Sequence, residues 1–179
     1  MKEKILIILI FCLALLISSS QFLRSSQQVI TEARNESKEE YPEANIPLKG
    51  FIQANISVET ILMDRAEVSL RAGCYLIRAV TDACVANAIK KGLEGKVEFR
   101  PTVYDVIMDI FRNLGIKVLA VKITEIKENT FIGQLIVQQK DKVLALDIRP
   151  SDATAIALRA KAPVYINESL AREVGNYIC

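Results

Sequence analysis

Apolar and polar side chains alternate along much of the chain after residue 50, which predicts a strand-rich domain. Ile52, Ala54, Ile56 and Val58 alternate with polar neighbours, as expected for a strand with one buried face. Six further strands are predicted on similar grounds at 67–71, 74–78, 116–126, 130–138, 142–148 and 163–166. The pairs Ala72-Gly73, Glu128-Asn129 and Lys140-Asp141 are predicted as the tight turns between consecutive strands.

Apolar residues at helical spacing predict three helices and a final helical turn. The first is expected from Thr81 to about Lys91, closed by Gly92 and Gly95. The second is expected over 102–114, with one apolar side formed by Val103, Ile107, Ile110, Phe111 and Leu114. The third is expected over 151–160, where Ala153, Ile156, Ala157 and Ala160 let the helix lie close to a sheet, and the turn over 169–174.

The two halves of this domain share one order of elements, three strands followed by a helix. The strand-to-helix joints are also similar, because Thr81-Asp82-Ala83 in the first half corresponds to Ser151-Asp152-Ala153 in the second. We therefore predict an α+β fold made of internally duplicated strand-strand-strand-helix units. The sheet is expected to be largely antiparallel, with the helices packed on one side.

The N-terminus has the plan of an export signal. Lys2 and Lys4 precede an unbroken apolar run over 5–17, and three serines follow. We predict a signal peptide or membrane anchor over 1–23, a polar linker over 24–50 and the folded domain over 51–179. Cleavage and anchoring are both open, and each places the domain outside the cytoplasm, with the membrane as a partner if the segment is uncleaved.

Composition removes several kinds of chemistry. The chain has no histidine, so serine–histidine and cysteine–histidine nucleophiles and histidine-ligated zinc are excluded. The net charge is only +2, and neither the first 50 residues nor the rest of the chain is a basic tail. A balanced total still leaves room for a local basic patch. Outside the signal, Cys74, Cys84 and Cys179 are an odd number of cysteines. A Cys74–Cys84 bridge and two buried free thiols are both open.

Polar residues gather at the joint before the third helix. Pro150 suits a helix start, Ser151 is expected to cap free N–H groups, and Asp152 in the first turn favours the positive helix end. These capping roles leave Arg149 and Asp147 unexplained. Arg149 is expected either to pair with the neighbouring aspartates or to help bind a phosphate.

A second polar joint, Arg100-Pro-Thr-Val-Tyr-Asp105, opens the helix predicted over 102–114. One interpretation is a solvated helix start with internal ion pairs. The other is that Arg100, Tyr104 and Asp105 meet the Arg149 joint across a groove.

With both joints, the sequence resembles the bifunctional nuclease domain family. The resemblance rests on Arg149-Pro-Ser-Asp-Ala153 followed by an alanine-rich helix and Ala162-Pro-Val-Tyr165, and on the Arg100–Asp105 stretch upstream. It covers about residues 52–172. The chain departs from the family pattern at Tyr104, where the family has histidine, at Val103 in place of threonine, and at Asp82 in place of glutamate.

The resemblance implies cleavage of DNA and RNA, that is, a metal-assisted nuclease acting on phosphodiester bonds. In this hypothesis Asp105, Asp147 and Asp152 hold Mg²⁺ or Mn²⁺, and Arg100 and Arg149 neutralise the phosphate. Ser151, Asp82 and Tyr104 are expected to support the site. The alternative is a non-catalytic binding or assembly module with the same fold, and a homo-oligomer is expected. The nuclease hypothesis stands first.

Overall fold

The computed structural model describes residues 42–179. The predicted signal or anchor and most of the predicted linker lie outside these residues. No helix within the described part is both long and apolar enough to span a bilayer.

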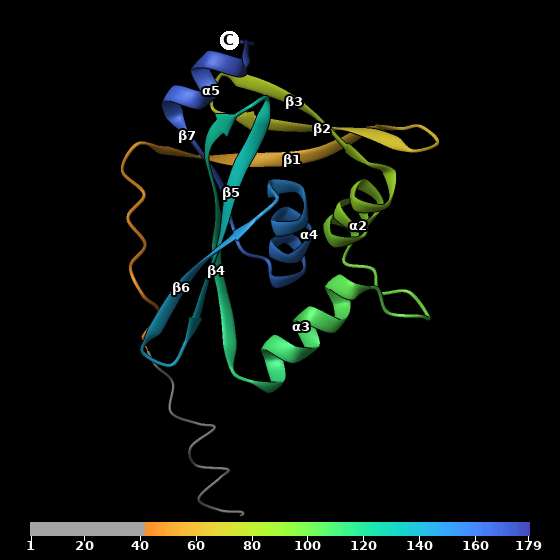
Figure 1. The fold of residues 1–179 in the computed structure, drawn as a ribbon, viewed down its shortest axis with the longest axis vertical. Helices are drawn as coiled ribbons and strands as arrows, with labels where there is room; N and C mark the ends of the chain where they lie inside the picture. Colours follow the sequence, from red (N-terminus) through yellow and green to blue (C-terminus); the bar gives the residue numbers. More distant parts are fainter. Residues whose placement is uncertain (1–41) are drawn as a thin grey trace, which may run out of the picture. The chain divides into compact units, whose positions relative to one another are not determined.

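A single eight-stranded mixed sheet organises the domain (Figure 1). Its strands are β1 (Phe51–Ile61), β2 (Arg65–Ala72), β3 (Tyr75–Asp82), β4 (Ile116–Lys127), β5 (Thr130–Gln139), β6 (Lys142–Ile148), β7 (Val164–Asn167) and β8 (Asn176–Tyr177). The spatial order is β6-β5-β4-β7-β1-β2-β3-β8. Within residues 42–179 only β4 and β7 pair in parallel, so the predicted largely antiparallel sheet is confirmed.

The sheet consists of two antiparallel meanders joined through β7. One meander is β1-β2-β3 and the other is β4-β5-β6, and β7 pairs with β1 on one side and β4 on the other. Left-handed backbone at Glu128, Asn129 and Lys140 forms two of the predicted hairpin turns, and Gly73 forms the third. The two-residue strand β8 has no sequence period and was not predicted.

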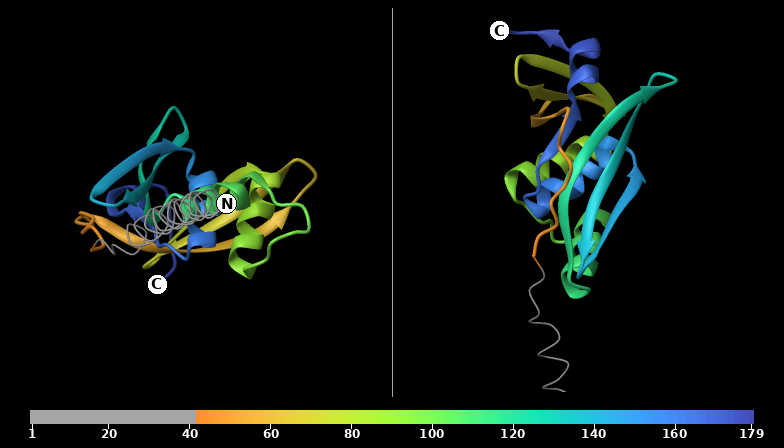
Figure 2. Two further views of the ribbon diagram at one scale, coloured as in Figure 1. Left: turned by 90° about the horizontal axis from the view of Figure 1, so that it is seen from below. Right: turned by 90° about the vertical axis from the view of Figure 1, so that its left-hand side faces the viewer.

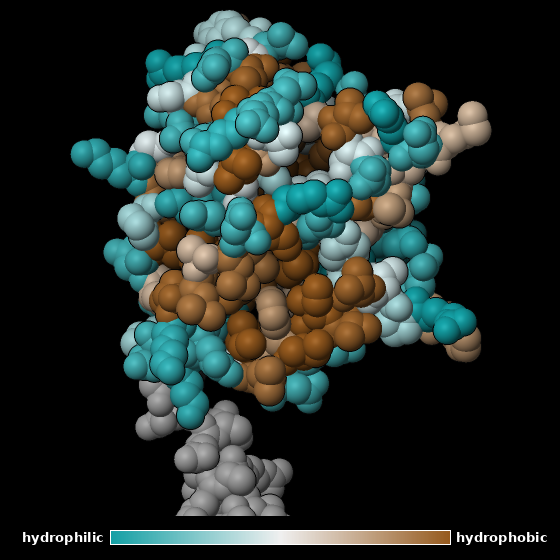
Figure 3. Space-filling model, viewed as in Figure 1, coloured by the Kyte–Doolittle hydropathy of each residue, from teal (hydrophilic) through white to brown (hydrophobic). Residues whose placement is uncertain are grey.

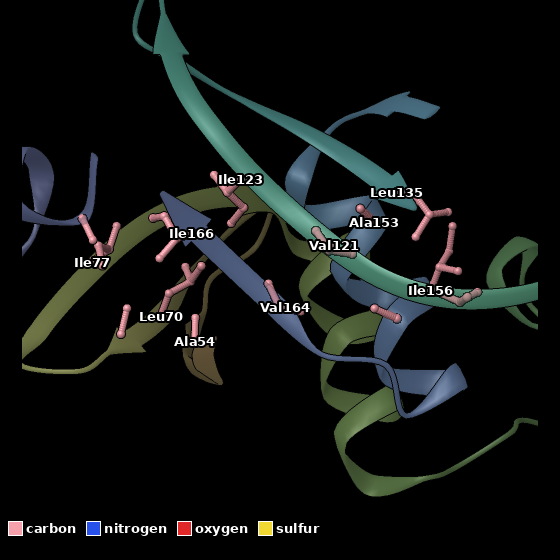
Figure 4. Packing of buried hydrophobic residues seen from close by; sticks show 14 of the residues in the cluster. Ala54, Leu70, Ile77, Val121, Ile123, Leu135, Ala153, Ile156, Val164 and Ile166 are labelled. Carbon is pink, nitrogen blue, oxygen red and sulfur yellow. The ribbon is translucent and has the colours of Figure 1, made fainter. Parts of the chain in front are cut away.

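Four helices pack against the sheet and complete the α+β fold: α2 (Ala83–Glu94), α3 (Val103–Asn113), α4 (Pro150–Ala160) and α5 (Glu168–Val174). Ala153, Ala155 and Ala157 of α4 are fully buried, because their small side chains let the helix pack closely against the elements around it. Ala153 and Ile156 lie beside Val121 and Leu135 in the core (Figure 4). The predicted close approach of this helix to the sheet is therefore confirmed.

One glycine has a different role from the predicted one. Gly95, in the left-handed region, is the residue that ends α2. Gly92 lies inside the helix, where a Cβ atom would come within 2.9 Å of the Leu158 Cβ. Its missing side chain lets α2 and α4 pack closely, so the prediction that Gly92 closes the helix was wrong.

The apolar side predicted for α3 is wrong in part. Val103, Ile110 and Leu114 were expected on one apolar side together with Ile107 and Phe111, but they are 63%, 48% and 57% exposed. The side that packs into the core contains Tyr104, Ile107, Met108 and Phe111. Apolar residues occupy more of the circumference of α3 than one packing face can cover, and the remainder faces solvent.

The same holds for the last strand of the second meander. Alternation along β6 places Leu144, Leu146 and Ile148 on one face, but Leu144 and Leu146 are 54% and 41% exposed. Only Ile148 packs against the core. The reason is the place of β6 at the edge of the sheet, where β5 is its one neighbouring strand among residues 42–179.

Neither alternative for the cysteines holds. Cys74 is bonded to Cys179, and Cys84 is a free, exposed thiol. The pairing follows from β8, which lies antiparallel to β3 and brings the last residue of the chain beside the β2–β3 turn. The sequence analysis did not predict β8, and it therefore did not predict this disulfide.

The internal duplication stays a prediction. Both halves have the order of three strands and a helix, but the matched letters take different helix positions. Asp82 is the N-cap of α2, whereas Asp152 lies in the first turn of α4, whose N-cap is Arg149. The two aspartates that correspond in sequence therefore do not occupy the same position at the start of the two helices.

Residues 42–50 run beside the β4–β5 hairpin without regular structure (Figure 2). The Gln138 side chain donates to the Pro42 carbonyl and accepts from the Ala44 N–H, and Lys117 pairs with Glu43. These contacts attach the segment to the sheet.

Candidate functional site

A cavity of about 470 Å³ opens between β2–β3, the β4–β5 turn and the start of α4. Its apolar lining includes Val68, Leu70, Ile77, Ile89, Ile123 and Ile166. Its polar lining includes Arg65, Thr81, Asp82, Thr130, Arg149 and Ser151. The cavity thus combines an apolar interior with charged and hydroxyl groups, a combination typical of small-ligand sites.

Arg149 is the cation that the structure fixes most firmly at this cavity. Its Nε donates to the Asp152 Oδ2 at 2.6 Å, and its Nη1 lies 3.2 Å from the Asp82 Oδ2. The side chain is 62% exposed despite these bonds. The Asp152 carboxylate, and then Asp82, raise the pKa of Arg149, so the guanidinium remains charged. A guanidinium that is permanently charged, held in one orientation and accessible to solvent is suited to binding a phosphate.

The start of α4 sets the position of Arg149. Pro150 is the first helical residue and Arg149 the N-cap, with no side chain capping the helix, so the predicted capping by Ser151 is not seen. Ser151 instead lines the cavity. Gly133 on β5 lets this turn approach the sheet, because a Cβ atom there would lie 2.9 Å from the Pro150 Cγ.

Tyr104 from α3 completes the contacts of Asp152. Its hydroxyl donates to the Asp152 Oδ1 at 2.6 Å, so the two oxygens of this carboxylate bind Tyr104 and Arg149. Burial, and next the Asp152 carboxylate, raise the pKa of Tyr104 far above neutrality. The phenol is therefore a hydrogen-bond donor and not a base at neutral pH.

Asp105 belongs to a second, buried arrangement. It accepts from the Thr102 N–H and hydroxyl, forming a capping box for α3, and from the Arg159 Nε at 2.7 Å. Both charged side chains of this pair are less than a tenth exposed. Burial alone would raise the pKa of Asp105, but the bonds from Arg159 and Thr102 outweigh it and lower that pKa to about 2.

Arg159 was not singled out from the sequence. It donates to the Ala88 and Ala155 carbonyls, and its guanidinium lies 5.4 Å from the centre of the Tyr104 ring. It therefore ties α2, α3 and α4 together behind the Tyr104–Asp152 bond. The one signal in the sequence is its place four residues after Ala155 on a face of small residues, where a long cation is unusual.

The remaining predicted residues lie apart from Arg149. Asp147 is exposed on β6 opposite Gln134, and alternation along the strand places it on the sheet face away from Leu146. Arg100 is exposed in the segment before α3. The structure thus joins Arg149, Asp152, Asp82 and Tyr104.

The three aspartates predicted to share a metal ion are not brought together. Asp105 is occupied by Arg159 and Thr102, and Asp147 lies on the other face of the sheet. Among residues 42–179, no three acidic or cysteine side chains are grouped as metal ligands. Asp82 and Asp152 bind the same guanidinium, that of Arg149, and of these two carboxylates Asp82 lines the cavity.

The sequence is similar to that of known proteins. The family model of the bifunctional nuclease domain matches residues 74–178. An uncharacterised protein of Mycobacterium tuberculosis is 38% identical over 90 residues, which cover 50% of this chain and 53% of that protein. Bifunctional nuclease 1 of Oryza sativa is 33% identical over 79 residues, and bifunctional nuclease 2 of Arabidopsis thaliana 34% over 79 residues. Each plant match covers 42% of this chain and 24% of the plant protein, so the chain spans about half or less of these relatives.

Proposed function

Because this chain belongs to the bifunctional nuclease domain family, we propose that its domain hydrolyses phosphodiester bonds of DNA or RNA at the Arg149 cavity. The observation that carries this proposal is the geometry of Arg149, a charged and exposed guanidinium held between two carboxylates. The apolar lining beside it offers room for a base next to the bound phosphate.

In this proposal Arg149 binds the phosphate of the substrate. A guanidinium binds two phosphate oxygens at once and stabilises the charge that develops on them during hydrolysis. Asp152 orients it through the Nε bond, and Tyr104 fixes the other oxygen of Asp152. The site therefore has a preorganised cation whose position depends on α3 as well as α4.

Asp82 and Asp152 are the residues that would hold Mg²⁺ or Mn²⁺. Two carboxylates with a substrate phosphate are an ordinary donor set for Mg²⁺, and hard oxygen donors suit both ions. Such an ion, when bound, would polarise the phosphoryl oxygens and make a water molecule more acidic. Asp105 is assigned to stability instead, because its oxygens are occupied inside the protein.

The second candidate is a binding module without catalysis. It is favoured by Tyr104, which stands where the family has histidine and stays protonated at neutral pH. It is also favoured by the two carboxylates that already pair with Arg149, since an anion must compete with them. In this case Arg149 would hold a nucleic acid or other phosphate ligand without cleaving it.

We propose an exported or membrane-anchored location for the domain. The Cys74–Cys179 bond supports it, because stable disulfides are typical of oxidising compartments. The basic and apolar N-terminal segment supports it independently.

Digestion of plasmid DNA and of RNA with Mg²⁺, Mn²⁺ or EDTA tests the nuclease proposal. We expect cleavage by the wild type and a loss of about 100-fold in Arg149→Ala and Asp152→Asn, since a lost transition-state contact costs about that factor. Arg112→Ala is the matched control, because Arg112 is an exposed arginine that also pairs with an aspartate three residues away.

Three outcomes separate the candidates. Cleavage that both site variants retain would remove these residues from the active site. Phosphate-dependent binding of nucleic acid that Arg149→Ala loses, without cleavage under any metal condition, would favour the binding module. Cleavage unaffected by EDTA would contradict the assignment of a metal to Asp82 and Asp152.

A further inference from the structure

The two ends of the sheet differ in how they are protected. One end is β8, which has two residues and is followed by the Cys74–Cys179 disulfide. The other end is β6, which has seven residues and pairs only with β5 within the described part of the chain. Proteins usually protect such an edge with proline, a bulge or inward-pointing charges. β6 carries the charged residues Lys142 and Asp147 near its two ends, but the four residues over 143–146 are apolar and pair with β5 in an unbroken register.

Exposed apolar side chains lie beside this open edge. We call them the β6–α3 face, which consists of Leu144, Leu146, Val103, Val106, Ile110 and Leu114. All six are between 41% and 63% exposed. The space-filling view shows apolar residues gathered over β6 and α3 on this side of the molecule (Figure 3).

We propose that a second copy of this chain covers the β6–α3 face, with β6 pairing antiparallel to β6 of the partner across a twofold axis. A twofold contact uses the same surface on both copies, so an unpaired edge strand can pair with the same strand of the second copy. In a continuous sheet, residues that face each other must lie on the same face. The register that meets this condition and pairs all seven residues centres on Ala145.

This register accounts for the exposed leucines. Leu144 of each copy lies opposite the partner subunit's Leu146, on the face shared with α3. Both leucines therefore gain a cross-strand apolar neighbour that the single chain does not provide. Lys142 lies opposite the partner subunit's Ile148, which places a lysine beside the Arg149 joint of the other copy.

The size of the surface fits a dimer. The six side chains expose roughly 500 Å² per copy, close to the largest apolar patch of an ordinary monomer. The open edge of β6 adds backbone to this area, and a standard interface buries about 800 Å² per partner. The apolar patch and the unpaired strand together are enough for a modest dimer.

A cysteine crosslink at the twofold axis tests the pairing directly. In a Cys12→Ser, Cys84→Ser background, which leaves the disulfide-bonded Cys74 and Cys179 as the native cysteines, Ala145→Cys would place two thiols opposite each other across the axis. We expect the full chain to form a covalent dimer on mild oxidation. Ser57→Cys, an exposed position on the central strand β1, is the matched control and should remain a single chain.

The mass in solution gives a second readout. We expect the wild-type full chain in mild detergent to sediment as a dimer at about 10 µM, and Leu144→Glu to weaken association at least tenfold. Leu62→Glu, which changes an apolar residue in the β1–β2 turn that is 68% exposed, should keep the dimer. Thermal unfolding of each variant checks that the fold is retained.

The proposal fails if Ala145→Cys crosslinks no better than Ser57→Cys. It also fails if the wild type is monomeric at this concentration, or if Leu144→Glu and Leu62→Glu associate equally. The last result would assign the dimer to another surface, such as the N-terminal apolar segment.

Discussion

Two arginine–aspartate contacts lie on either side of Tyr104 and differ in one property. Arg159 and Asp105 are both less than a tenth exposed, whereas Arg149 is 62% exposed beside Asp152. Tyr104 touches both, since its ring lies beside the Arg159 guanidinium and its hydroxyl binds Asp152. An arginine–aspartate pair therefore occurs twice within one network, once with both side chains buried and once with the arginine exposed to solvent.

The difference separates stability from binding. A buried pair cannot exchange its partner for a ligand, and removing one member leaves an uncompensated charge. An exposed pair contributes little to stability, and water or a phosphate can replace its partner. We therefore assign Arg159 and Asp105 to holding the helices, and Arg149 to binding.

Removing the buried cation should have the largest effect. Arg159→Ala leaves Asp105 buried without its partner, and we expect a loss of about 3–5 kcal/mol in the free energy of unfolding. Urea unfolding followed by circular dichroism measures it. Arg112→Ala, which breaks an exposed pair on α3, should cost less than about 1 kcal/mol. Equal losses in the two variants would show that burial does not distinguish the pairs.

Acid should weaken the buried pair next. The pKa of Asp105 is about 2 in the folded protein, below its ordinary value, so its ionised form stabilises the fold above about pH 4. We expect about 2 kcal/mol of this stability to disappear as the pH falls from about 4 to about 2. Unfolding measured across this range in wild type and Asp105→Asn should show the difference, and parallel pH profiles would contradict it.

Cutting the link between the two pairs should have a smaller effect. Tyr104→Phe keeps the ring beside Arg159 and removes only the hydroxyl that binds Asp152. We expect a loss of about 1–1.5 kcal/mol in unfolding free energy, because Asp152 keeps its bond from Arg149. Tyr177→Phe is the control, since that ring is 69% exposed. A loss above about 3 kcal/mol would mean that Asp152 behaves as a buried group.

Removing the exposed cation should change stability least. Arg149→Ala is expected to alter the unfolding free energy by less than about 1 kcal/mol, because the guanidinium it removes is 62% exposed and Asp152, which is 18% exposed, keeps its bond from Tyr104. The same denaturation experiment measures it beside Arg159→Ala. A change as large as that of Arg159→Ala would contradict the division between the two pairs and make Arg149 structural.

Local patterns were sufficient for most of the fold. Alternation over 116–148 predicted β4, β5 and β6, because the period of a strand is a property of neighbouring residues. Turn residues such as Asn129 and Lys140 take left-handed backbone at the expected places. Patterns could not show which apolar side chains would be covered, and the predicted apolar side of α3 therefore includes residues that are exposed.

The site could be predicted only in part for a related reason. Arg149 and Asp152 were found because they stand three residues apart at a helix start. The Asp105–Arg159 contact spans 54 positions, and nothing local in the sequence connects them. Asp105 was therefore assigned to the site by its motif, although tertiary packing uses it elsewhere.

The Cys74–Cys179 bond makes residues 74–179 a closed covalent ring. Both arginine–aspartate pairs and the whole of α2, α3 and α4 lie within this ring, whereas β1 and β2 lie outside it. One protease cut in the exposed segment 96–100 would leave the two pieces attached to each other until the disulfide is reduced. A single cut between residues 74 and 179 therefore does not separate the chain into two molecules, whereas a cut in β1 or β2 does.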